Sequence, residues 1–292
     1  MRVTDGMRYQ NVRANLSRLQ AQNAQAQQQA ASGLRLERPS DDPVAAAELA
    51  RLRASLSSAS THRESIQRAQ GDAELAESTL AQVNELMADA KEAAMQGAND
   101  SLSATDRANL AIEVRNIRTE LLKLANTRGN KGYLFSGSKT DTAAFDSNGA
   151  FNGDDTDQVI DAGGSSPLSV SASGAQAFTA AGGRNVFADL ESLAQSLESD
   201  NRSAVAASLD LIDAGASQVT KERARIGLVV SKLQASDGVL EQLGVDLSRQ
   251  QSEVGAVDPF EAFSKVTTLA QSLQQAVQVS RQVLDLGDLW NR

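Results

Sequence analysis

The chain of 292 residues contains no cysteine, one histidine, four prolines and only 3% aromatic residues. The absence of cysteine excludes disulfides, thiol nucleophiles and cysteine metal sites together. His62 has no second histidine and no acid cluster nearby, so we interpret it as a solvent-facing helix residue rather than a metal ligand or catalytic base. The scarcity of aromatic residues indicates a core of leucine, valine and alanine, which is typical of slender helical layers.

The sequence also lacks the residue patterns on which common enzyme mechanisms depend. Its glycine-rich stretches read as turns without the lysine of a phosphate-binding loop, and no nucleophile and base fall into a recognisable arrangement. The acidic run at residues 154–157 lacks the ligand spacing and the bidentate glutamate of an EF-hand, which leaves calcium binding as a less favoured alternative. The sequence therefore predicts no enzyme activity, no cofactor and no metal site.

Membrane spans and nucleic-acid binding are likewise not predicted. No apolar run reaches the roughly 18 residues that a membrane-spanning helix needs, and the net charge of −9 argues against nucleic acid as a partner. Residues 1–29 lack the apolar core and the cleavage site of a signal peptide, so export would need another route. With 41% hydrophobic and 22% charged residues, we expect a folded, soluble chain.

Residues 258–290 have the pattern of a long helix with more apolar surface than one chain can bury. Asp258, Pro259 and Glu261 mark its start as a capping residue, a proline at the first helical position and an acid three residues past the cap. Apolar residues then form two adjacent heptad seams, which call for several neighbours. We predict that an assembly interface contains Phe263, Val266, Leu269, Leu273, Val277 and Leu284.

Residues 4–31 have the pattern of a second terminal helix. Apolar and small residues recur there at alternating steps of four and three, while many glutamines would make the helix marginal by itself in water. We expect it to pair with the C-terminal helix and to be completed by neighbouring subunits. The interface residues predicted on this helix are Val12, Leu16, Leu19, Asn23 and Ala26.

The two ends of the chain carry opposite charge. Residues 1–38 hold six arginines against two acids, and residues 252–292 hold five acids against three bases. This difference can bias which ends meet, or it can reflect solvated helix faces whose charges are screened over about 8 to 10 Å.

A break at residues 33–43 separates the first helix from a predicted helical rod. Pro39 cannot continue a helix, and Asp42 followed by Pro43 is a cap and first turn, so these three residues are expected to form a domain hinge and cap. Helical periods then cover residues 44–95, 104–127 and 186–197. From Val205 to Leu247, thirteen positions step by four and three without a slip, which predicts a long coiled-coil seam.

The helical period is lost in the middle of the chain. Between residues 136 and 184 there are six acids and two bases, with frequent glycine and asparagine and short β-prone runs. We interpret this segment as a small β-rich insertion that faces solvent.

These patterns predict a mainly α-helical fold, an elongated antiparallel bundle or coiled coil from both chain halves with a small β-rich central insertion. The predicted divisions are an N-terminal core helix at 1–38 paired with a C-terminal core helix at 255–292, two halves of a helical rod at 39–135 and 185–254, and an outer insertion at 136–184.

Several stretches resemble the flagellin superfamily. The segment from Ala31 to Val44 (ASGLRLERPSDDPV) is similar to its signature after the first terminal helix. Within the superfamily, the stretch from Leu124 to Thr142, with Tyr133–Thr142 as its specific part, is similar to the hook-associated protein 3 family of hook–filament junction proteins, as are Phe145, residues 151–154 and Glu222–Gly227. The ending at residues 284–292 departs from the family's short leucine-rich terminus, so Trp290 is either a buried anchor of the assembly interface or a packing cap.

The resemblance implies a structural subunit of the bacterial flagellum, placed between the hook and the filament and assembled through terminal helices that order on polymerisation. It implies a homo-oligomeric ring, hook-associated protein 1 and flagellin as neighbours, and an export chaperone on the C-terminal region. It also implies secretion through the flagellar type III apparatus to the hook–filament junction, without a cleaved signal peptide. The alternatives are flagellin itself, the bulk filament subunit, and a cytosolic coiled-coil scaffold.

Overall fold

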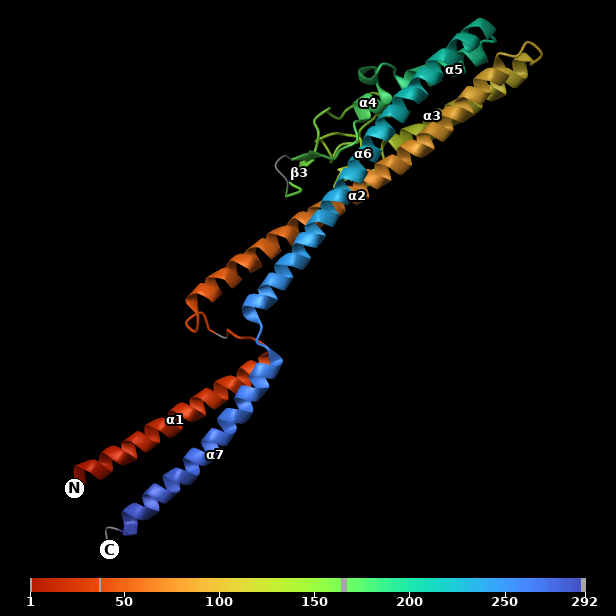
Figure 1. The fold of residues 1–292 in the computed structure, drawn as a ribbon. Helices are drawn as coiled ribbons and strands as arrows, with labels where there is room; N and C mark the ends of the chain where they lie inside the picture. The colour runs from red at the N-terminus through yellow and green to blue at the C-terminus, as the bar shows by residue number, and fades with distance from the viewer. Residues whose placement is uncertain (1, 37, 164–166, 290–292) are drawn as a thin grey trace. The chain divides into compact units, whose positions relative to one another are not determined.

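The computed structural model describes residues 2–36, 38–163 and 167–289, and these residues are mainly helical (Figure 1). Capped starts and heptad periods place the helices close to their predicted limits, and α2 runs through Gly71 without a break. The long helices are α1 (Arg2–Ser32), α2 (Pro43–Gly97), α3 (Ala104–Ala125), α5 (Val186–Glu198), α6 (Arg202–Gly255) and α7 (Pro259–Leu289). The short elements are β1 (Arg128–Gly129), β2 (Gly132–Tyr133), β3 (Val159–Ile160), β4 (Leu168–Ser169), α4 (Gly174–Phe178) and a 3-10 turn, η1 (Ala180–Gly182).

The chain folds into two compact units. The terminal unit contains residues 1–58 and 244–292, and the central unit contains residues 59–243. The units divide within α2 and α6, whereas the predicted domain limits lie in the loop before α2, at 38/39, and at the last residues of α6, at 254/255; those limits stay a prediction. None of the described helices is long and apolar enough to cross a membrane.

The core of the central unit is built along α6. Five side chains spaced seven residues apart, Val205, Ile212, Val219, Ile226 and Leu233, are completely buried. These are positions of the predicted seam, and burial of each apolar side chain stabilises the fold by roughly 1.5 to 3 kcal/mol. Two polar positions of the same seam form ion pairs with α2: Arg223 bonds Glu77 at 2.6 Å, and Asp237 bonds Arg63 at 3.0 Å.

The Arg63–Asp237 pair gives a testable pH dependence. Two hydrogen bonds from the guanidinium, at 3.0 and 3.1 Å, lower the pKa of Asp237 below its ordinary value of 3.8. A depressed folded-state pKa adds stability that is present above pH 3.8 and is lost as the pH falls through the folded-state pKa. We expect Arg63→Met to lower the melting temperature at about pH 7, and to lower it less as the pH falls through the folded-state pKa of Asp237, because a protonated carboxyl no longer attracts the guanidinium. Thermal melts across pH measure this.

The matched control is Arg51→Met, because Arg51 pairs with Glu48 at 3.3 Å on an exposed helix face and its side chain is 72% exposed. Exposed ion pairs contribute little to stability, so the melting temperature of this variant should equal that of the parent protein at every pH. If Arg63→Met lowers the melting temperature by the same amount across the whole pH range, the Arg63–Asp237 pair does not couple protonation of Asp237 to the stability of the fold.

The segment at 136–184, which was predicted to face solvent, is exposed at many positions, but part of it packs into the core of the central unit. Its two paired strands, β3 and β4, are two residues long, and single bridges join Ser136 to Ser173 and Phe145 to Phe151. Phe145 and Phe178 are buried, with ring centroids 5.5 Å apart. Its acids lie outside the helices and strands, whereas the Phe145 and Phe178 rings are buried in the core.

Two polar side chains of α6 hold this segment in place. Gln218 donates to the carbonyls of Ala177, Thr179 and Arg184, each at 3.1 Å, and accepts from the Arg184 N–H at 2.8 Å. The buried Glu222 accepts hydrogen bonds from the Ser173 N–H and from Arg225, both at 2.7 Å. Buried polar groups must find partners, and these find them in the backbone of the segment.

Candidate assembly interface

The residue segments that follow α1 and precede α7 are hydrogen-bonded to each other in the terminal unit. Leu34 and Ala256 form an antiparallel bridge, in which the Arg35 N–H donates to the Gly255 carbonyl at 2.8 Å and the Val257 N–H to the Gly33 carbonyl at 3.0 Å. The Arg35 guanidinium also donates to the Val254 carbonyl at 2.9 Å. From this bridge α1 packs along α7, with the start of α1 and the end of α7 at the far end of the pair (Figure 1).

The residues predicted for the assembly interface lie mostly along this helix pair, but they are poorly covered. Only Ala26 is buried, and Phe263 is exposed. The side chains that are merely half-buried are Val12, Leu16, Leu19, Asn23, Val266, Leu269, Leu273 and Val277. In α6, by contrast, every seventh seam residue from Val205 to Leu233 is completely buried, so the terminal pair leaves more apolar surface that its own chain does not cover.

Further large apolar side chains of the terminal unit are exposed. Val44 is 82% exposed, Phe260 86% and Phe263 63%, and Met7, Tyr9 and Val279 are each more than half exposed. The remaining predicted positions, the Leu284 side chain and Trp290, lie outside the described residues. Whether the whole set forms one interface between subunits stays a prediction.

Asn23 is the one predicted interface residue with a polar side chain. Its Oδ1 is buried and accepts no hydrogen bond from the part of the chain that the structure describes. A polar residue in an apolar seam costs stability but restricts the register of helix packing, because only some registers give it a partner.

The predicted hinge is an ordered turn followed by a capped helix. The Asp41 N–H donates to the Arg38 carbonyl at 3.0 Å across Pro39, and α2 begins at Pro43. Asp42 caps that helix by accepting from the Ala45 N–H at 3.0 Å. Hinge motion at this turn stays a prediction.

The opposite charges of the chain ends do not produce ion pairs between α1 and α7. Among the side chains that the structure describes, no such pair lies within 4.0 Å; Arg35 instead lies 3.6 Å from Asp42. Screened, solvated helix faces fit this arrangement better than direct pairing.

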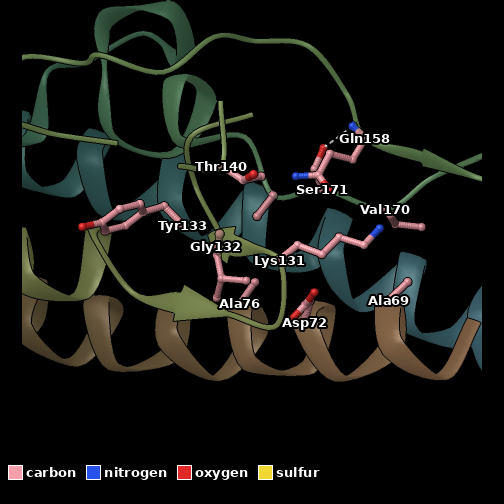
Figure 2. Close-up of a pocket in the computed structure, with 12 residues that line it drawn as sticks. Ala69, Asp72, Ala76, Lys131, Gly132, Tyr133, Thr140, Gln158, Val170 and Ser171 are labelled. Carbon is pink, nitrogen blue, oxygen red and sulfur yellow. Dashed lines mark hydrogen bonds between the residues drawn. The ribbon is translucent and has the colours of Figure 1, made fainter. Parts of the chain in front are cut away.

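Residues Tyr133–Thr142, the most specific part of the resemblance to hook-associated protein 3, form a tight loop over α2 beside a small cavity (Figure 2). The Tyr133 N–H donates to the Thr140 carbonyl at 2.8 Å. Gly132 and Gly137 have φ values of +122° and +68°, and a Cβ on either would clash with the backbone of Thr140 or Asp154. The cavity volume of ≈ 30 Å³ is about that of one water, so it offers no ligand site.

The acidic run and His62 have structural partners. Asp154 accepts from the Ser138 N–H at 2.7 Å and from its hydroxyl at 2.6 Å, and these bonds lower the pKa of Asp154. No group of three or more potential metal ligands occurs among the described residues. His62 is not simply solvent-facing as predicted, since its Nδ1 lies 3.2 Å from the Asp161 carbonyl and its side chain is 26% exposed.

Sequence reasoning missed one feature of the terminal unit, a pocket between the end of α1 and the start of α7. No sequence motif marks this pocket, because the residues that line it are mostly small or charged. It is lined by Ala26, Gln29, Arg35, Ala256, Val257, Asp258, Glu261, Ala262 and Lys265.

Comparisons with known proteins match both chain ends. Residues 3–140 match the bacterial flagellin N-terminal helical region, and residues 209–285 match the bacterial flagellin C-terminal helical region. Flagellar hook-associated protein 3 of Escherichia coli K12 is 30% identical over 283 residues, which cover 88% of this chain and 89% of that protein. Its Salmonella typhimurium counterpart is 28% identical over 282 residues, with the same coverage of each chain. The flagellar junction protein of Legionella pneumophila shares the fold, with a TM-score of 0.56 and 17% identity over 72% of this chain and all of that one.

Proposed function

Because this chain belongs to the flagellar hook-associated protein 3 family, we propose that it is a structural, non-enzymatic subunit of the junction between hook and filament. The main observation in support of this mechanism is that the α1–α7 helix pair leaves many of its apolar side chains partly exposed. Apart from Ala26, the described seam residues of α1 and α7 are half-buried or exposed, whereas α6 has five completely buried seam residues, spaced seven apart from Val205 to Leu233. Neighbouring subunits would supply the missing cover on assembly.

The proposal includes specific neighbours. Copies of the chain form a ring, with hook-associated protein 1 on the hook side and flagellin on the filament side. Before assembly, an export chaperone covers the C-terminal region, and the flagellar type III apparatus exports the chain without a cleaved signal peptide. Support comes from the family assignment and from the unsatisfied apolar surface of α7, which a chaperone would shield before export.

A deletion strain tests the junction role. We expect cells without this protein to build hooks but to release flagellin into the medium, because the filament would have no base on which to grow. Re-expression of the parent chain should restore motility. Filaments of normal length on the deletion strain would contradict the proposal.

A filament subunit, by contrast, would polymerise. Purified protein seeded with filament fragments should therefore give no long filaments, and an extended homopolymer would favour flagellin instead. The 88% coverage by curated relatives named hook-associated protein 3 supports the junction over that alternative. A cytosolic scaffold would remain in cells whose flagellar export is intact.

A further inference from the structure

All the described aromatic side chains of the terminal unit are exposed. Tyr9 is 56% exposed, Phe260 86% and Phe263 63%. In the central unit, by contrast, four phenylalanines, Phe135, Phe145, Phe178 and Phe187, are almost completely buried. A chain with only 3% aromatic residues thus leaves its largest apolar groups in the terminal unit uncovered. Such groups provide much of the binding free energy when a partner covers them.

Phe260 is presented on an ordered turn. Asp258 caps the start of α7 by accepting from the Phe260 N–H at 2.8 Å, and the helix begins at Pro259. A capped first turn fixes the backbone that carries the ring. The side chain therefore projects from a defined position and loses little backbone freedom when it binds.

The pocket between α1 and α7 lies on the other side of the same helix. Ala26 and Ala262 are buried and contribute only methyl groups to the pocket, which leaves a volume of ≈ 320 Å³ with room for an aromatic ring. Two cations, Arg35 and Lys265, and two carboxylates, Asp258 and Glu261, also line the pocket. Phe260 and Ala262 are two residues apart, a rotation of about 200° around the helix, so Phe260 cannot enter the pocket of its own chain.

We propose that Phe260 of one subunit, with Phe263 beside it, inserts into the α1–α7 pocket of the next copy of this chain. A second copy covers both features at once, whereas an unrelated protein seated on Phe260 would leave the pocket empty. This inference rests on the proposed function, because it assigns the contact between neighbours in the ring.

The positions of the two features also fix the symmetry of the contact. A side chain on one face that enters a pocket on the opposite face gives a head-to-tail contact, which repeats from subunit to subunit and closes into a ring when the rotation allows it. A twofold dimer would need both features on the same face.

Because the chain has no cysteine, introduced pairs can be cross-linked without background. Lys265 is exposed and lines the pocket, so we choose Phe260→Cys and Lys265→Cys. In isolated flagella from a strain that carries the double variant, oxidation should give a ladder of covalent multimers of this protein. Each single variant should give none, and a strain that co-expresses the two single variants should give a dimer.

The matched control replaces Phe260→Cys by Val279→Cys, an exposed apolar position of the same helix, and should give no ladder with Lys265→Cys. Three outcomes would overturn the proposal. They are a double variant whose product stops at the dimer, a dimer of the Phe260→Cys single variant, and a cross-link only to another protein. Motile cells whose double variant gives no product would also overturn it, an outcome that leaves the junction role intact.

If Phe260→Cys prevents incorporation, a photoreactive benzoylphenylalanine at position 260 keeps the aromatic group in place. The cross-linked peptide should then come from residues 26–35 or 256–265 of a second copy of the chain. A peptide from elsewhere in the chain, or from flagellin, would show that another surface covers Phe260.

Discussion

Leu273→Asp is expected to abolish motility while the central unit stays folded. Leu273 lies on α7 and is only half-buried against α1, and its position is outside the central unit. On assembly, neighbouring subunits would bury the introduced carboxylate without a cation to pair with it, which costs several kcal/mol per site. Motility on soft agar and the amount of the protein in isolated flagella measure the effect.

Gln274→Asp is the matched control, because Gln274 is the next residue on the same helix and is exposed. It introduces the same charge, so it should be secreted and incorporated like the parent. Far-UV circular dichroism should show equal melting of the central unit in both variants. Normal incorporation of Leu273→Asp would remove this part of α7 from the assembly interface.

The same argument predicts how the monomer behaves. A helix pair with mostly half-buried seam residues has little packing to protect its backbone hydrogen bonds. Hydrogen exchange on the monomer should therefore be faster in α1 and α7 than in α6, and it should slow on assembly as the ends become ordered. Strong protection of both helices in a verified monomer would show that the terminal pair is already complete.

Periodicity was enough to predict the helices and the central seam. The seven-residue spacing from Val205 to Leu233 marks buried positions without any knowledge of the partner helices, because an α-helix turns the same face inward at that spacing. Capping residues located the starts of α2 and α7 for a similar reason, since Asp42 and Asp258 bond to backbone N–H groups a few residues ahead.

The rest depends on contacts between residues far apart in the chain. The inward position of Phe145 and Phe178, and the bonds from Gln218 to Ala177 and Arg184, have no period, so average composition pointed to a solvated segment instead. In the terminal unit, the sequence could indicate an uncovered face on α7. It could not indicate the pocket, because that pocket exists only where α1 meets α7.

Phe178→Ala is expected to lower the free energy of unfolding by about 3 to 5 kcal/mol, the usual cost of removing a buried phenylalanine. The Phe178 ring lies 5.5 Å from Phe135, 5.5 Å from Phe145 and 5.9 Å from Phe187, measured between centroids. Its loss leaves a cavity among these rings that they cannot fill without leaving their own contacts. Urea unfolding followed by circular dichroism gives the value.

Phe260→Ala provides the matched comparison, because it removes the same side chain from a position that is 86% exposed and should change the monomer's stability by less than about 0.5 kcal/mol. A solvent-facing segment would make the two variants equal, and replacement of residues 141–181 by a flexible linker would then be harmless. Since Phe145 and Phe178 lie within that range and are buried, we expect the linker variant to be destabilised at least as much as Phe178→Ala. A loss below about 1 kcal/mol for Phe178→Ala would mean that the aromatic cluster contributes little to the central unit.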